Sequence, residues 1–190
     1  MESIYQKSAV ANPSGIGAKK TAMDKKSKEI KSHDRNDELA IDLAALGYPG
    51  FSYLKTSSRK APAEVVLSAL QVAHLEARLV EALPWVLLEC GDLDWDWLVR
   101  GALLDDLQNK LGFLTNLARR LAERSGRAET ARLLTDLEAV LEASRLPTEG
   151  TLCHDSITEV ERRWLKSNRS KEAEHWGLLT DLVPEHLSYS

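Results

Sequence analysis

The chain has 190 residues, of which 43% are hydrophobic and 28% are charged, and its formal net charge is −4. This composition is typical of a globular protein that buries its own core, and no apolar run approaches the ~20 residues that a bilayer-spanning helix needs. Two cysteines, Cys90 and Cys153, and the lack of a signal-peptide pattern exclude a disulfide-rich secreted scaffold. We therefore expect a cytoplasmic protein with no membrane partner.

The charge is divided unevenly along the chain. Residues 1–35 hold eight Lys/Arg and four Asp/Glu, which gives +4, whereas residues 36–190 hold 17 and 25, which gives −8. The first segment has few large apolar residues, so residues 1–35 are predicted to form a disordered basic tail. Because an acidic body repels phosphates, any nucleic-acid contact by residues 36–190 would have to be local.

Residues 36–190 are predicted to form one all-α domain, a small helical bundle with parts at 36–90, 91–145 and 150–190. In the first part, Leu39, Leu43 and Leu46 follow helical spacing, and Gly47 is suited to end that helix in a left-handed cap. A second helix is predicted from Pro62 to Leu83, because proline favours the first helical position. Pro84 removes a backbone donor and is expected to kink or break this helix.

The stretch from Gly91 to Glu123 begins with aspartates and tryptophans and continues into leucines at helical spacing. Asp92 is predicted to cap one long helix, with Asp94 and Asp96 in its first turn, where carboxylates favour the helix dipole. The apolar seam of this helix is predicted to comprise Leu104, Leu107, Leu111, Leu114, Ala118 and Leu121. A second helix over 128–143 would complete an antiparallel helical hairpin.

The last part is predicted to hold two further helices. Ser156 and Glu159 have the spacing of a capping box for a helix through Lys166, and Ser170 is expected to cap a helix that runs to Leu179. No strand and no internal repeat is predicted. We expect the core to include Trp85, Trp164 and Trp176.

Trp95 and Trp97 are candidates for a partner interface. They are two residues apart, so on a helix they point to different faces. One can therefore lie in the core while the other is partly exposed. Exposed tryptophan is enriched in protein interfaces, but tryptophan is also a common core residue, and packing within the chain is the alternative.

The stretch LAALGYPGFSYLKTSSRKAP, over residues 43–62, resembles the second half of an Xre-type helix-turn-helix. Leu46-Gly47 matches the end of that motif's first helix, and RKAP, over 59–62, approximates its closing turn. Pro49-Gly50 departs from the pattern. The resemblance implies DNA contacts, to phosphates or base edges, by Ser52, Lys55, Thr56, Arg59 and Lys60. The alternative is a surface loop with incidental positive charge.

The stretch RSKEAEH has the Arg and His spacing found in HEPN-type helical ribonucleases, which it resembles. The resemblance implies that His175 handles a proton and that Arg169 steadies a phosphate. Such a spacing also arises by chance in charged helices. Cys153, His154 and Asp155 are consecutive and cannot form a triad by themselves. A zinc site would need Cys153, His154, His175 and His186 to be brought together, so we expect no metal and no cofactor.

These features favour a non-enzymatic regulatory protein that binds another macromolecule. The specific hypothesis is a prokaryotic antitoxin-like protein that binds a partner protein and operator DNA, since the Ala-, Leu- and Arg-rich body suggests a bacterial source. A homodimer is a further alternative, because the leucine seam can pair within or between chains. The competing hypotheses are a HEPN-like ribonuclease and a structural helical protein.

Overall fold

A computed structural model describes residues 33–56, 59–154 and 156–187. The described chain is mostly helical, which confirms the predicted fold class at that level. After a helix over residues 33–46, the elements are η1 (Pro49–Phe51), α2 (Pro62–Leu70), α3 (Ala77–Glu89), α4 (Trp95–Leu104), α5 (Gln108–Arg124), α6 (Ala128–Glu142), β1 (Gly150–Thr151), α7 (Glu159–Asn168), α8 (Lys171–His175), β2 (Leu178–Leu179) and η2 (Pro184–His186). Most of the predicted basic tail, residues 1–32, lies outside the described residues, and residues 33–35 belong to the helix.

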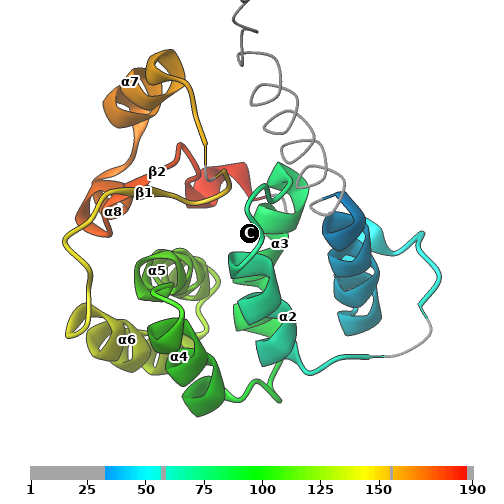
Figure 1. The fold of residues 1–190 in the computed structure, drawn as a ribbon. Coiled ribbons are helices and arrows are strands. Elements are labelled where there is room, and N and C mark those ends of the chain that lie inside the picture. The colour runs from blue at the N-terminus through cyan, green and yellow to red at the C-terminus, as the bar shows by residue number, and fades with distance from the viewer. Residues whose placement is uncertain (1–32, 57–58, 155, 188–190) are drawn as a thin grey trace, which may run out of the picture.

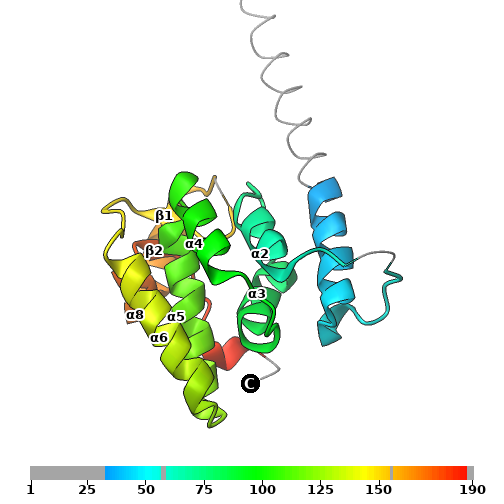
Figure 2. The same ribbon diagram turned by 90° about the horizontal axis from the view of Figure 1, so that it is seen from below.

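Helix α5 is the centre of the packing. It contacts α3, α4, α6, α8 and η2. All residues from 111 to 118 are buried, so this part of α5 is enclosed on every side. Helices α2 and α3 lie between α5 and the helix over 33–46 (Figures 1 and 2). No helix within the described ranges is both long enough and apolar enough to cross a membrane.

The first described helix ends as predicted at Gly47. Gly47 has φ +95°, and the Tyr48 amide donates to the Leu43 carbonyl at 3.0 Å, which closes the left-handed cap. Tyr48 is buried, with its ring centroid 5.4 Å from that of Trp85 on α3. The cap therefore turns the chain so that an aromatic contact joins the first helix to α3.

The predicted helix from residue 62 to residue 83 is wrong, because α2 ends at Leu70 and Pro84 lies inside α3. Backbone groups at the break between α2 and α3 form hydrogen bonds with residues that are distant in the sequence. The Leu75 amide donates to the Cys153 carbonyl at 2.8 Å, and Asn36 donates from its side chain to the His74 carbonyl at 2.9 Å. These contacts satisfy backbone groups that a continuous helix would otherwise have paired internally.

The prediction of one long helix through Glu123 is also wrong, because the structure has two helices there, α4 and α5. Asp94, not Asp92, caps α4, because its carboxylate accepts from the Trp97 amide at 2.9 Å. After α4, Asp106 takes φ 57° and the Leu107 amide donates to the Ala102 carbonyl at 2.8 Å, the pattern of a left-handed helix end. The break removes Leu104 from the seam, of which Leu111, Leu114, Ala118 and Leu121 are buried.

Helices α5 and α6 run antiparallel, as their side-chain contacts show. The Gln108 amide donates to the Ser144 carbonyl at 3.1 Å near one end, and Asn116 donates to Glu138 at 2.9 Å further along. At the other end, Gly126 has φ +70° in the connecting turn. Gly112 in α5 lies against the fully buried ring of Trp176.

The C-terminal part contains strands that the sequence did not predict. Strands β1 and β2 pair in parallel, with Gly150 opposite Leu178. The capping box of α7 is formed by Thr158 and Glu161, two residues later than predicted. Ser170 caps α8 as predicted, but α8 ends at His175 because the following chain turns into β2.

The tryptophans predicted to be core differ in exposure. Trp176 is buried and Trp85 is partly buried against the core, but the prediction for Trp164 is wrong. Trp164 lies on α7, and 53% of its surface is exposed. Helix α7 stands out from the rest of the molecule in Figure 1, which leaves this side chain without a core to enter.

Candidate functional site

Helix α4 presents an exposed apolar side next to its buried one. Trp95 is partly buried and packs against the core, whereas Trp97 is 43% exposed. The structure therefore separates the two candidate interface tryptophans onto different faces, as the spacing indicated. Leu104 lies about two helical turns beyond Trp97 and is 85% exposed, and Leu103 is also exposed.

Helix α6 carries a second exposed apolar stripe. Leu133 and Val140 are exposed and lie on the side of α6 that faces away from α8. The hydrogen bond from Gln108 to Ser144 brings the end of α6 near the end of α4, and both helices lie along the lower side of the molecule in Figure 1. We refer to Trp97, Leu103, Leu104, Leu133 and Val140 together as the α4–α6 face.

The predicted DNA-contacting segment does not form a recognition helix in the described residues 48–56 and 59–61, where the only helical element is η1. Arg59 pairs with Asp92 at 3.1 Å, and Lys60 pairs with the mostly buried Asp42 at 2.8 Å. The hydrogen bond to Asp42 raises the pKa of Lys60. Both cations therefore have partners within the fold.

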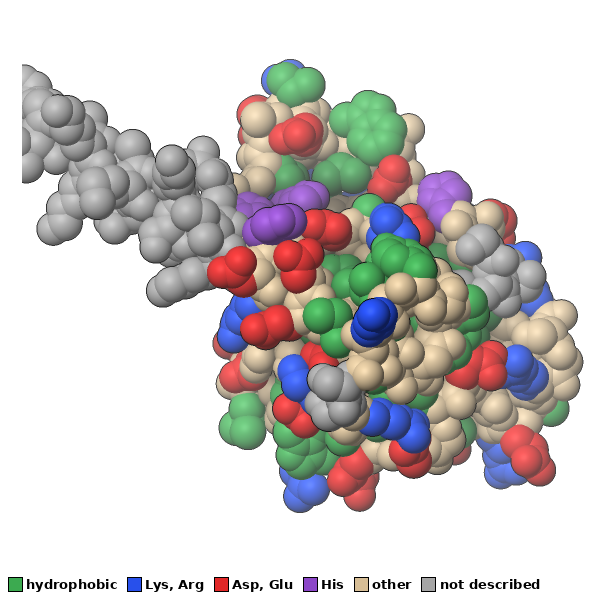
Figure 3. Space-filling model, turned by 90° about the vertical axis from the view of Figure 1, so that its right-hand side faces the viewer, with side chains coloured by type: hydrophobic (Ala, Val, Ile, Leu, Met, Phe, Trp, Pro, Cys, Tyr) green, Lys and Arg blue, Asp and Glu red, His purple; other side chains and the backbone are tan. Residues whose placement is uncertain are grey.

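The remaining predicted DNA contacts, Ser52, Lys55 and Thr56, are exposed. They follow η1 in the loop at the right of Figure 1. Figure 3 views the molecule from that side. Lys and Arg side chains are interspersed there with Asp and Glu and form no continuous basic surface among the described side chains that the view shows.

The two residues of the predicted ribonuclease motif have separate partners. His175 forms a hydrogen bond of 2.7 Å with Glu142 on α6, and Arg169 pairs with Glu149 at 3.0 Å and with Glu174 at 3.3 Å. Arg169 is largely buried, whereas His175 is half exposed. The sequence spacing therefore brings these two side chains to two different ion-pair clusters.

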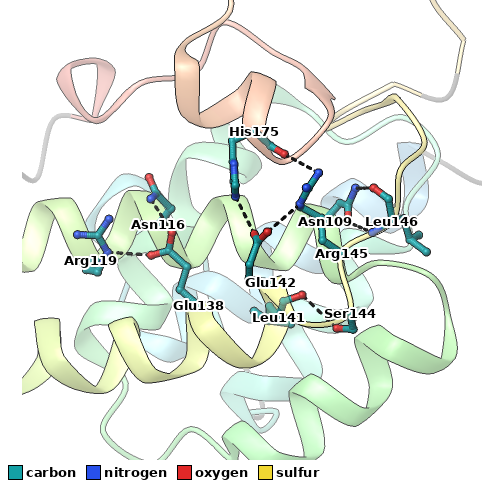
Figure 4. Close-up of polar contacts among 10 residues, drawn as sticks. All are labelled: Asn109, Asn116, Arg119, Glu138, Leu141, Glu142, Ser144, Arg145, Leu146 and His175. Atoms are coloured by element: carbon teal, nitrogen blue, oxygen red, sulfur yellow. Dashed lines mark hydrogen bonds and ion pairs between the residues drawn. The ribbon is translucent and has the colours of Figure 1, made fainter.

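Around His175, polar contacts join α5, α6 and α8 (Figure 4). Arg145 donates to Glu142 at 3.0 Å and to the His175 carbonyl at 3.1 Å. Partial burial acts to raise the pKa of Glu142, but hydrogen bonds from His175 and Arg145 outweigh it and hold this pKa below its ordinary value. The contacts therefore favour an ionised carboxylate that ties α8 to α6.

An open groove of about 420 Å³ runs beside this network and is lined by Arg119, Glu138 and His175 among others. Arg119 is held by Glu138 at 2.8 Å and by Glu123 at 2.6 Å. Because two carboxylates already neutralise this guanidinium, the groove offers no uncommitted cation from Arg119 to a phosphate. The geometry is that of a structural ion-pair network.

Cys153 and His154 lie where β1 leads towards α7. Their backbone meets the loop between α2 and α3, and the ring centroid of His154 lies 5.8 Å from that of His74. Burial raises the pKa of the Cys153 thiol to about 11, which disfavours the thiolate that nucleophilic chemistry needs. Within the part of the chain that the structure describes, no three His, Cys, Asp or Glu side chains are arranged to hold a metal ion.

Cys153 is expected to react slowly with iodoacetamide in the folded protein at neutral pH. A thiol with a pKa of about 11 is deprotonated roughly 100-fold less than one near 9, and its alkylation should slow by a similar factor. Mass spectrometry of tryptic peptides over time measures this rate. Protein unfolded in guanidinium is the control, and equal rates in both states would contradict the burial of this thiol.

Comparison of the chain with protein-family models, with curated proteins and with solved structures finds no match. The fold and the site define a helical bundle with exposed apolar side chains on α4 and α6.

Sequence reasoning found Trp97 but missed most of the α4–α6 face. The spacing of Leu104 continues that of the α5 leucines and so predicts a place in the buried seam, which is wrong because α4 ends at this residue. The signal that could have separated it is the Asp105-Asp106 pair, since aspartate tolerates the left-handed conformation that ends a helix. The signal for Val140 is that it falls outside the apolar stripe of α6 that helical spacing predicts, which includes Leu134 and Leu141.

Proposed function

We propose that this protein is a non-enzymatic regulatory protein that binds a partner protein through the α4–α6 face. The observation that carries the proposal is Leu104, a large apolar side chain that is 85% exposed and lies about two helical turns along α4 from the exposed Trp97. Adjacent exposed apolar side chains with tryptophan among them are typical of protein interfaces. The acidic residues flanking α4 provide the polar rim of such an interface.

In its specific form, the proposal is a prokaryotic antitoxin-like protein whose partner is a protein toxin. Two features support it. The face is built on two well-packed helices and so is pre-organised for binding, and the acidic charge of residues 36–190 favours a basic partner surface. Operator binding finds less support, because Arg59 and Lys60 are engaged by Asp92 and Asp42.

The proposal is tested by a photo-crosslinking amino acid placed at Leu104 of the full chain in its native host. A matched chain carries the same group at Tyr53, which is exposed elsewhere. The proposal predicts a crosslinked protein that appears with the first chain and is absent with the second. After purification, that protein should bind the wild type, and Trp97→Ala and Leu104→Lys should each weaken binding by about 30-fold or more.

Two results would contradict the proposal. One is binding of the identified protein that Trp97→Ala and Leu104→Lys leave unchanged. The other is RNA cleavage by the purified wild type that His175→Ala abolishes, since that result would support the ribonuclease alternative.

A further inference from the structure

Helix α7 has an apolar side that does not pack against the core of the described residues. It is the one α-helix among the described residues that contains no buried residue. Val160 is 70% exposed and Trp164 is 53% exposed, and their spacing places them on the same side of the helix. Such a helix gains little from intramolecular packing, so its exposed pair calls for another explanation.

Ion pairs to Glu149 help to attach α7 and the residue that follows it, Arg169, to the rest of the molecule. The Glu149 carboxylate lies 3.4 Å from Arg162, 3.5 Å from Lys166 and 3.0 Å from Arg169. Three cations therefore share one carboxylate, with Arg169 also reaching Glu174. Residues 162–171 contain five Lys/Arg and no Asp/Glu, so the surroundings of Trp164 are basic in an otherwise acidic domain.

The α4–α6 face has the opposite charge around the same kind of apolar surface. Asp94 and Asp96 lie at the start of α4, and Asp105 and Asp106 follow its end directly, whereas Arg100 is the single cation within α4. An exposed apolar helix with basic neighbours and an exposed apolar face with acidic neighbours are complementary. One chain carries both.

The two surfaces cannot meet within one molecule. Helix α7 lies at the upper left of Figure 1 and contacts β2, while α4 and α6 lie at the bottom, with α5 and α8 in between. A contact between them therefore requires two molecules. Because each copy has one α7 and one α4–α6 face, two copies can exchange two identical contacts about a twofold axis.

We propose that α7 of one copy docks on the α4–α6 face of a second copy to form a homodimer. Val160 and Trp164 cover Leu104 and its apolar neighbours, in the manner of an amphipathic helix bound in a groove, and Arg163 faces the carboxylates around α4. The inference rests on the proposed function, because it uses the same face. It adds that self-association and the partner compete for that face.

The test is the molar mass of the full chain in solution, measured by sedimentation velocity over a range of concentrations. The wild type is expected to be dimeric at high concentration. Val160→Asp and Leu104→Lys should each weaken dimerisation by about 30-fold or more. Both changes suit their helix ends, since a carboxylate is favourable in the first turn and a cation in the last, so the fold is retained.

An equimolar mixture of the two variants provides the decisive measurement. One variant keeps an intact face and the other an intact α7, so the mixture should restore a dimer that neither variant forms alone. Tyr53→Asp, on an exposed residue away from both surfaces, is the control and should dimerise as the wild type does.

A monomeric wild type, a dimer that Val160→Asp leaves intact, or a mixture that stays monomeric would each overturn the inference. An intact dimer would assign association to another surface, including residues 1–32. These outcomes are separate from the proposed function. Val160→Asp leaves the face free, so partner binding should persist in this variant even if the dimer is lost.

Discussion

Replacing Trp176 with alanine is expected to lower the free energy of unfolding by about 3–5 kcal/mol. Trp176 is fully buried, and its ring lies against Gly112 in the second turn of α5. The opposite change, Gly112→Ala, should also destabilise, because the added Cβ would lie 2.3 Å from the ring. Overpacking of this kind costs about 1–3 kcal/mol, which exceeds the roughly 1 kcal/mol of helix propensity that alanine adds.

Urea unfolding followed by circular dichroism measures both effects as a lower midpoint at unchanged slope. Gly101→Ala in α4 is the matched control. There the added Cβ would meet the Leu67 Cδ2 at 2.5 Å, and this flexible end of a side chain can move away. A Gly112→Ala protein as stable as Gly101→Ala would show that the ring of Trp176 does not occupy the space above α5.

Asn109→Leu is expected to lower the free energy of unfolding by about 2–6 kcal/mol. The buried Asn109 amide donates to the Leu146 carbonyl at 3.0 Å, and its oxygen accepts from the Leu146 amide at 2.8 Å. Leucine has a similar size but pairs neither group, and each backbone group left without a partner costs about 1–3 kcal/mol. The same urea titration measures the loss.

Two further variants make this result specific. Asn109→Asp keeps the acceptor for the Leu146 amide, so it should lie between the wild type and Asn109→Leu. Asn168→Leu removes an asparagine whose side chain donates to the Trp164 carbonyl on the exposed surface, and it should change stability little. Equal losses for Asn109→Leu and Asn168→Leu would contradict the role assigned to the buried amide.

Much of the fold could be predicted from local signals. Gly47 ends its helix as glycine favours, Ser170 caps α8, and α6 has bounds within a residue of those predicted. The helix breaks were missed because their causes are not local. The break after Leu70 has hydrogen-bond partners in Asn36 and Cys153, which no pattern within residues 62–83 reveals.

The candidate site was predictable only in part. The spacing of Trp95 and Trp97 correctly indicated one partly buried and one exposed ring. The prediction that Trp164 lies in the core is wrong because α7 stands apart from the core, which nothing in the sequence around Trp164 signals. Exposure of this kind depends on where a helix is placed, which is a property of the tertiary structure.

The break between α2 and α3 affects how the chain acquires its fold. Its backbone groups are held by Asn36, near the start of the described chain, and by Cys153, about 80 residues beyond the break along the sequence, so the boundary between α2 and α3 is complete only when those segments have packed. Contacts between segments that are distant in the sequence slow folding, because the chain loses the entropy of closing the intervening loop before they form. The folding rate of this chain should therefore be slower than its helix content alone would suggest.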